Sequence, residues 1–306
     1  MRLELIQRTF FIGIIVATTI CKICAAGTHK AEATVSAMDD SKREITLDKP
    51  AQRIISLAPH ATELLFAVGA GAQIVGVSEY SDYPEQAKKI LSVGNVFALD
   101  LERLISLKPD LVVVWGTGNA KLLTNKLREN HVTVFESEPH DFETIATSME
   151  RLATLTGKVA KGKEAAASFR TRLETLRHTY QLKPGQKTVN VFFQIWQKPL
   201  MTLNDQHLVS SAIQLCGGKN IFGKLKEISP TVSLEAVLSL NPQAIVATSG
   251  EKQDVLSEWL QFPRLFAVNK NNLFIIDGNW INRSGPRILD GVESLCKNLN
   301  IARKKI

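Results

Sequence analysis

A duplicated segment constrains the fold of this chain more than any other feature of its sequence. LERLISLKPDLVV at residues 101–113 and LEAVLSLNPQAIV at residues 234–246 share six of thirteen positions, among them the Glu, the Ser-Leu pair and the Pro. Each copy has the pattern of a short amphipathic helix that a Pro ends, followed by an apolar strand. The sequence therefore predicts two similar α/β halves, which usually enclose a ligand-binding cleft.

A second repeat supports the first. AVGAGAQIVG at residues 67–76 aligns with QLCGGKNIFG at residues 214–223, and the two repeats follow in the same order in both halves. The N-terminal half carries about fourteen extra residues between them, within residues 78–100. This insertion contains SEYSDYP, a run of loop-forming residues that we place at the mouth of the cleft.

Apolar runs such as LVVV at residues 111–114 predict strands that are buried on both faces of a parallel sheet. Residues 141–182 instead have helical spacing, with Asp141 as N-cap. Gly157 and Gly162 weaken the middle, where a kink or a break is the alternative to one continuous helix. One helix of about 40 residues would reach about 60 Å and lie across both halves as a stiff connector. The predicted domains are a signal peptide (1–26), an N-terminal extension (27–50), an N-terminal α/β lobe (51–140), a connecting helix (141–182) and a C-terminal α/β lobe (183–306).

The first 26 residues have the pattern of a secretory signal. Arg2 and Arg8 form a basic start, residues 10–20 form an apolar core too short to span a bilayer comfortably, and CAA at residues 24–26 forms a small-residue exit. We therefore expect export to the periplasm. The alternative is a lipoprotein signal with Cys21 or Cys24 as the lipidated residue, although each of these cysteines follows an Ile where a small residue is preferred.

Composition excludes several classes of function. Removal of the signal leaves about 280 residues with 34 basic and 29 acidic side chains, an excess of five positive charges that is spread along the chain. Because no basic stripe with interleaved aromatics is present, nucleic-acid binding is not expected. The sequence also lacks zinc-ligand spacing, a complete dinucleotide fingerprint, a phosphate loop and a GxSxG elbow, so we expect no metal, no cofactor and no catalytic residues.

The mature chain keeps two cysteines, Cys216 and Cys296. An even number in an exported protein predicts a disulfide between them, which would close a loop of about 80 residues and tie the last helix to the C-terminal lobe. The alternative is two buried thiols that pack as small hydrophobes.

Ligands of two-lobe α/β proteins bind outside the carboxyl ends of the strands, so the residues that follow each strand are the candidate ligand contacts. Three of the four tryptophans fall at these strand ends, where aromatic side chains suit a large, flat or hydrophobic ligand; core packing is the alternative for any single one. The predicted ligand-binding residues are Ala58, Pro59, His60, Tyr80, Phe97, Trp115, Gln194, Trp196, Trp280 and Arg283.

Five motifs together resemble the periplasmic vitamin B12 (cobalamin)-binding proteins of ABC importers, which are class III substrate-binding proteins. They are ISLAPHATELLFAVGA, VGVSEYSDYPEQA, LERLISLKPDLVVVW, LCGGKNIF and NWINRSGPRIL, and the resemblance extends over residues 52–299. It implies two Rossmann-like lobes joined by a backbone helix, little closure on binding, a monomeric binder, and delivery of ligand to a permease dimer with its ATPase. It also implies that Cys216 and Cys296 form the disulfide.

The resemblance gives a role to Glu102 and Glu235, which occupy the same place in the two repeats. One such Glu per lobe meets permease arginines in the family, so a pseudo-symmetric binder matches a two-subunit transporter. The alternative is a carboxylate that stabilises a helix N-terminus.

The chain departs from the family at two positions where the family has tryptophans that help to enclose the corrin. One of them is occupied here by Val96 or Phe97, and the other by Ser229. Trp196 and Phe97 are candidates to compensate. Otherwise the cleft is reshaped for haem, a ferric siderophore or another corrinoid, and Tyr80, Tyr83 and His60 are then the candidate iron ligands. A hydrolase that uses His60 and a carboxylate is the alternative from another class of protein.

Overall fold

The structure is a computed structural model, and it describes residues 34–95, 98–119, 121–249 and 255–306. Residues Glu32–Ile306 form one compact unit. Within the described residues, no helix is both long enough and apolar enough to cross a bilayer. The predicted signal peptide, with Cys21 and Cys24, lies outside the described residues, and so does Phe97.

The N-terminal lobe is built on a four-stranded sheet of order β4-β3-β7-β8, in which all neighbouring strands are parallel. Its strands follow the predicted apolar runs. The elements of this lobe are β3 (Ile54–Ser56), α1 (Pro59–Ala67), η1 (Gly71–Gln73), β4 (Ile74–Val77), η2 (Glu85–Lys89), β5 (Gly94–Asn95), β6 (Ala98–Leu99), α2 (Leu101–Ser106), β7 (Leu111–Trp115), α3 (Lys121–Glu129) and β8 (Val134–Ser137).

The C-terminal lobe repeats this plan with a parallel sheet of order β10-β9-β11-β12. When the strands of each sheet are numbered along the chain, both sheets have the same spatial order: second, first, third, fourth. The first sequence repeat forms α2 and β7 in one lobe and α7 and β11 in the other, so the predicted duplication is confirmed. The elements here are β9 (Val189–Gln194), α6 (Leu208–Leu215), β10 (Gly218–Asn220), α7 (Leu234–Leu240), β11 (Ala244–Ser249), η3 (Ser257–Gln261), α8 (Phe266–Asn269), β12 (Leu273–Asp277), α9 (Gly278–Ile281) and α10 (Ile288–Arg303).

The central strand of each lobe is apolar on both faces because both faces are covered. Leu111 and Val113 of β7 point into the core shared with α1 and α4 (Phe142–Leu155), whereas Val112 and Val114 point into a second core on the opposite face. β11 alternates in the same way between two cores. Each sheet therefore lies between apolar layers and leaves its carboxyl edge as the place for polar and exposed side chains.

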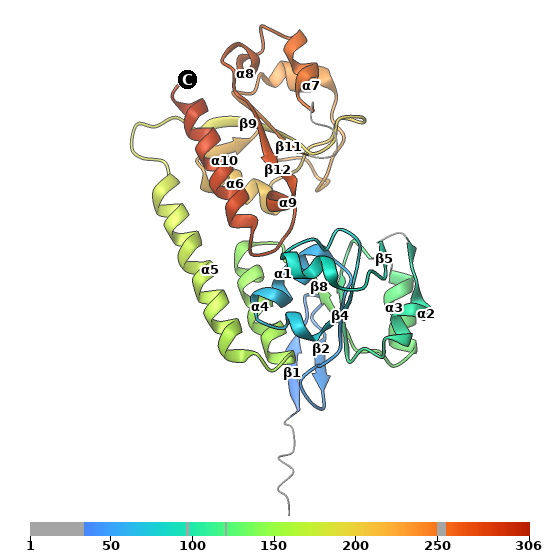
Figure 1. Cartoon of the computed structure of the whole chain (residues 1–306). Coiled ribbons are helices and arrows are strands. Elements are labelled where there is room, and N and C mark those ends of the chain that lie inside the picture. Colours follow the sequence, from blue (N-terminus) through green and yellow to red (C-terminus); the bar gives the residue numbers. More distant parts are fainter. Residues whose placement is uncertain (1–33, 96–97, 120, 250–254) are drawn as a thin grey trace, which may run out of the picture. The chain divides into compact units, whose positions relative to one another are not determined.

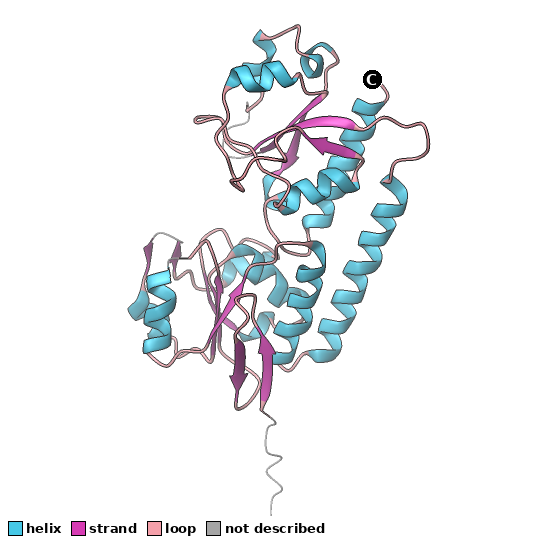
Figure 2. Cartoon of the chain, turned by 180° about the vertical axis from the view of Figure 1, so that it is seen from behind, coloured by secondary structure: helices cyan, strands magenta, loops and turns pink. Residues whose placement is uncertain are grey.

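The prediction of one continuous helix over 141–182 is wrong. The segment forms two helices, α4 (Phe142–Leu155) and α5 (Val159–Tyr180), which lie side by side (Figures 1 and 2). Asp141 is the N-cap of α4, as predicted, with a reciprocal hydrogen bond to Thr144. The chain turns at Gly157, whose φ of 70° is a left-handed conformation that favours glycine.

The helix α5 alone is the backbone helix that leads from one lobe to the other, about 33 Å long for its 22 residues. It packs on α1 and α4 of the N-terminal side and on α6 and α10 of the C-terminal lobe. Arg170 binds Glu143 and Glu150 of α4 at 2.5 and 2.7 Å, and Arg172 binds Asp290 of α10 at 2.7 Å. Two neighbouring arginines near the middle of α5 thus fasten the connector to α4 on one side and to α10 on the other.

The predicted disulfide is confirmed. Cys216, at the end of α6, is bonded to Cys296 of α10, with 4.6 Å between their Cα atoms and a sequence separation of 80 residues. Both residues are fully buried in the core of the C-terminal lobe. The bond ties the final helix to α6, as expected for a cross-link that restricts the unfolded chain.

Gly162 allows α4 and α5 to approach closely, because a Cβ there would lie only 2.1 Å from the Cβ of Ala153. We expect Gly162→Ala to lower the free energy of unfolding by about 2 kcal/mol, since overpacking outweighs the gain of about 1 kcal/mol in helix propensity. Urea unfolding of the variant measures this. The exposed Ala167→Gly in the same helix is the control for propensity. A stabilised Gly162→Ala variant would contradict the close contact.

Candidate functional site

The carboxyl ends of the parallel strands carry most of the predicted contact residues. His60 follows β3, Tyr80 follows β4, and Trp115 ends β7. In the other lobe Trp196 follows β9, while Trp280 and Arg283 follow β12. We call these six residues the strand-end site. The remaining tryptophan, Trp259, is buried in the C-terminal lobe, whereas the other three lie at strand ends as expected; their contact with a ligand stays a prediction.

His60 lies in the first turn of α1 and is buried. Its Nε2 lies 3.1 Å from the Oγ of Ser137 at the end of β8, and its ring meets the Trp115 indole edge to face at a centroid distance of 6.1 Å. Burial lowers the pKa of His60 from 6.5 to about 4, against the opposing effects of the Ser137 hydrogen bond and the charge of Asp40. The imidazole is therefore neutral at pH 7, and it packs against the Trp115 indole.

Trp115 is held in place on three sides, although its side chain is partly exposed. Its Nε1–H donates to Glu138 Oε1 at 3.1 Å, and its ring covers Gly118 so closely that a Cβ there would lie 1.8 Å from the indole. Glu138 also accepts the backbone N–H of Thr117 at 2.7 Å. The indole is thus a fixed apolar surface at the strand ends, with little rotamer entropy left to lose on binding.

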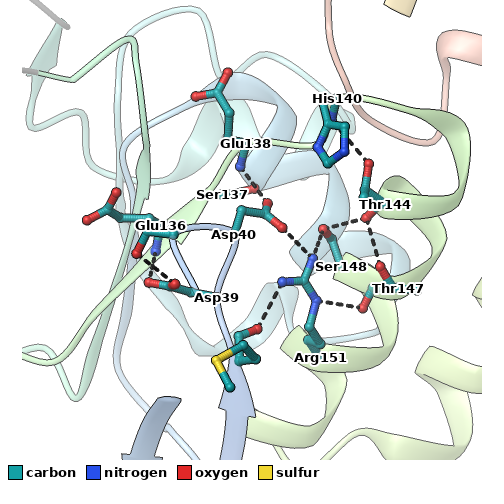
Figure 3. Close-up of polar contacts among 12 residues, drawn as sticks. Asp39, Asp40, Glu136, Ser137, Glu138, His140, Thr144, Thr147, Ser148 and Arg151 are labelled. Carbon is teal, nitrogen blue, oxygen red and sulfur yellow. Dashed lines mark hydrogen bonds and ion pairs between the residues drawn. The ribbon is translucent and has the colours of Figure 1, made fainter. Parts of the chain in front are cut away.

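The N-terminal extension is bonded to the segment around Glu138, the residue that accepts the Trp115 N–H (Figure 3). Its strands β1 (Val35–Met38) and β2 (Glu44–Leu47) form an antiparallel hairpin. Asp40, in the turn, accepts the backbone N–H of Glu138 at 2.6 Å and binds Arg151 of α4 at 2.7 Å. The hairpin therefore fixes the chain next to Trp115. Sequence reasoning missed Asp40 and Glu138, although Asp-Asp between the alternating runs VSAM and REITL is a hairpin signal.

Two of the residues predicted to contact a ligand are instead buried within the lobes. Gln194 is buried, accepts Trp259 Nε1–H at 2.7 Å and donates to the Val255 carbonyl at 3.1 Å, so both of its polar atoms are satisfied by the C-terminal lobe. Ala58 is fully buried and is the N-cap of α1, which begins at Pro59. The burial of Gln194 and Ala58 argues against the direct ligand contacts that the sequence predicts for them.

The other predicted aromatic contacts are more open. Tyr80 is 71% exposed and has a φ of 65°, an uncommon conformation for a residue with a side chain. Trp196 is 62% exposed, and its Nε1–H donates to the Lys198 carbonyl in its own loop at 3.0 Å. Trp280 is half-buried within α9. These side chains have surface to offer to a ligand.

An ion cluster joins the two lobes beside the strand-end site. Glu63 of α1 accepts Arg287 Nη2–H at 2.5 Å, Arg287 Nε–H at 3.0 Å and Arg283 Nη1–H at 3.2 Å. Arg283 Nη1 also binds Asp82 at 2.6 Å, and the Arg287 guanidinium lies 3.8 Å from the centroid of the Tyr83 ring. Sequence reasoning found Arg283 but not its partners, because they are more than 200 residues away in the chain.

The cluster leaves little for a hydrolase. The carboxylate of Glu63, three residues after His60, is occupied by arginines, and the hydrogen-bond partner of His60 is the fully buried Ser137. Over the residues that the structure describes, no group of three or more His, Cys, Asp and Glu side chains is arranged to hold a metal ion. The geometry fits a binding surface better than a reacting one.

A hollow of about 690 Å³ lies elsewhere, between the start of α4, the end of α5 and the end of α6. Its lining includes Phe142, Arg177, Gln181 and Gln214. A smaller pocket of about 130 Å³ lies in the C-terminal lobe beside Gln194 and Trp259. Neither hollow is lined by a residue of the strand-end site.

His60 gives the site a testable pH dependence. The pKa of His60 is about 4 in the folded chain and near 6.5 in the unfolded chain. Between pH 4 and 6.5 the imidazole is therefore protonated in the unfolded chain but neutral in the folded chain. Stability contributed by neutral His60 is therefore lost as pH falls from 6.5 towards 4, by about 3 kcal/mol in all. We expect His60→Gln to make the decline of the unfolding free energy over this range shallower.

Urea unfolding at several pH values between 4 and 7 measures this slope. Burial also lowers the pKa of His207 to about 4, so His207→Gln is an independent comparison and the double variant should be shallower still. Parallel curves for the wild type and His60→Gln would show that the buried imidazole is not the acid-sensitive group.

Comparisons with known proteins agree with this geometry. The family model described as periplasmic binding protein matches residues 54–279. The vitamin B12-binding protein of Vibrio cholerae is 39% identical over 257 residues, which cover 84% of this chain and 92% of that protein. The crystal structure of the periplasmic vitamin B12-binding protein BtuF of V. cholerae has a TM-score of 0.75 at 38% identity, with 83% of this chain and 99% of that chain covered.

A more distant neighbour shares the fold alone. The crystal structure of the periplasmic haem-binding protein HutB of V. cholerae has a TM-score of 0.70 at 20% identity, covering 81% of this chain and 98% of that chain.

Proposed function

Because the chain belongs to the periplasmic binding protein family, we propose that it is the substrate-binding protein of a cobalamin ABC importer, capturing cobalamin or a related corrinoid in the periplasm. The observation that carries the proposal is its 39% identity over 84% of the chain to a vitamin B12-binding protein. The fixed Trp115 indole supports it, since a corrin is a large macrocycle that binds by area burial. No catalytic step belongs to this role.

Haem or a ferric siderophore is the second candidate, and one feature favours it. Tyr80 is highly exposed at the strand ends, so its phenol oxygen is accessible as a ligand for iron. His60 suits an axial role less well, because it is buried and its Nε2 is already paired with Ser137. The similarity to the haem-binding protein HutB is one of fold only.

Calorimetric titration of the purified mature chain, from Gly27 onward, tests the cargo. We expect one-to-one binding of cyanocobalamin and much weaker binding of haemin and of a ferric hydroxamate, because the fixed Trp115 indole offers contact area to a corrin and the buried His60 is already paired with Ser137. Trp115→Ala should weaken cobalamin binding by at least tenfold through lost contact area. Binding of haemin without cobalamin would keep the importer role and replace the cargo.

The permease is proposed to dock on the outer ends of the two lobes. Glu102 and Glu235 lie in the first turns of α2 and α7, at equivalent places in the repeat, and both are exposed. The N-caps Asp100 and Ser233 already satisfy the first backbone donors of these helices. The two carboxylates are therefore available to a two-subunit partner that presents arginines.

The double variant Glu102→Ala, Glu235→Ala should impair cobalamin uptake by cells and leave the affinity of the soluble protein within about twofold. Uptake by cells and calorimetry of the purified protein measure the two effects separately. The pair Glu129→Ala, Glu164→Ala removes the same charge from exposed positions elsewhere and should behave as wild type in both. A loss of affinity in the first pair would place these carboxylates in the ligand site instead.

A further inference from the structure

The ion cluster between the lobes contains two arginines but carries no net charge. Glu63 and Asp82 supply two carboxylates, and Arg283 and Arg287 supply two guanidinium groups. The remaining Nη2 of Arg283 donates to Asn279 Oδ1 at 2.7 Å. The donors that arginine normally offers to a ligand carboxylate are thus largely taken by groups of the protein itself.

The two carboxylates differ sharply in exposure. The side chain of Glu63 is 1% exposed, whereas that of Asp82 is 44% exposed. Asp82 also lies between Tyr80 and Tyr83, two of the more exposed aromatic side chains of the described residues. Arg283 and Arg287 lie beneath, at 12% and 16% exposure. A ligand at the strand ends therefore meets an ionised carboxylate first and compensated arginines behind it.

Asp82 is well suited to remain ionised. Its partial burial alone would raise its pKa, but the hydrogen bond and the charge of Arg283 outweigh this effect and lower the pKa below the usual value. Asp82 is not needed to satisfy the buried Glu63, which has Arg287 on both of its oxygens. As a half-exposed ion pair, the contact of Asp82 with Arg283 adds little to stability.

We propose that Asp82 is a specificity-determining residue, which excludes macrocycles with peripheral carboxylates and admits those whose peripheral carboxyls are amides. The inference rests on the proposed function, since it assumes that a tetrapyrrole-like ring binds at the strand ends. With Asp82 ionised, a ligand carboxylate meets a like charge and finds Arg283 already neutralised. If the negative charge of Asp82 is removed, the positive charge of Arg283 is available to pair with a ligand carboxylate. The preference for amides then disappears.

The test uses ligands that differ in a single charge. Mild acid hydrolysis converts one peripheral propionamide of cyanocobalamin into a carboxylate, and the purified monocarboxylic acids are compared with cyanocobalamin itself by calorimetry at pH 7. For the wild type we expect at least one monocarboxylic acid to bind about tenfold more weakly than the amide. In Asp82→Asn this ratio should fall to about one or reverse, with cyanocobalamin affinity changed by less than about threefold.

Asp290→Asn is the matched control. Asp290 also pairs with an arginine, Arg172, at similar exposure, but it lies on α10 against α5, away from the strand ends. It makes the same change of charge and should keep the wild-type ratio of amide to acid. If Asp82→Asn folds poorly, the wild type suffices, because raising the ionic strength from about 20 to 500 mM should shrink the discrimination between amide and acid.

An unchanged ratio in a folded Asp82→Asn variant, or a ratio indifferent to salt in the wild type, would overturn the inference. Failure of the proposed function looks different, because the wild type would then not bind cyanocobalamin at all. In that case haemin, which carries two carboxylates, decides the role of Asp82. The Asp82→Asn variant should bind haemin about tenfold more tightly than the wild type does, and equal affinities would reject the inference.

Discussion

The arrangement of the strand ends depends on one buried charge. Glu63 is almost completely buried, and its partners are Arg283 and Arg287 of the other lobe. Separating the lobes would leave this carboxylate unpaired in a low-dielectric environment, which typically costs about 3–5 kcal/mol. Together with the fastening of α5 by Arg170 and Arg172, the pairing disfavours the wide hinge motion that flexible connections allow. Trp115 and Arg283 are thus set in position before a ligand arrives, which lowers the cost of binding.

The sequence predicted the plan of the molecule well, because duplication and apolar strands are local signals. Both lobes have the same strand order, and the disulfide joins the expected cysteines. The error lay in the connector. Gly157 and Gly162 marked a weak point, but helical periodicity does not reveal that the chain reverses there. That reversal depends on the contact between Gly162 and Ala153 across two helices, which is a tertiary property.

The sequence predicted those site residues whose position follows from the sheet topology. It did not predict the residues that pair with partners far away in the chain. The rule that ligands bind at the carboxyl ends of parallel strands found His60 and Trp115, which contact each other in the structure. It also selected Gln194, which follows the same rule but turns inward to bond Trp259. The partners of Arg283 were missed because nothing near Glu63 in the sequence indicates an arginine 220 residues away.

Rigidity makes the release of a ligand a physical problem for the proposed importer. A binding protein that changes conformation little when its ligand binds stores little free energy that opening could release. The free energy for ligand release must therefore come from the partner. The duplication places one exposed carboxylate, Glu102 or Glu235, on each lobe, so a two-subunit permease would hold each lobe separately. Any movement of one permease subunit against the other would then act on the contacts between the lobes, which include the buried pairing of Glu63 with Arg283 and Arg287. The same ion cluster that orders the strand ends for capture would therefore set the resistance that transport has to overcome.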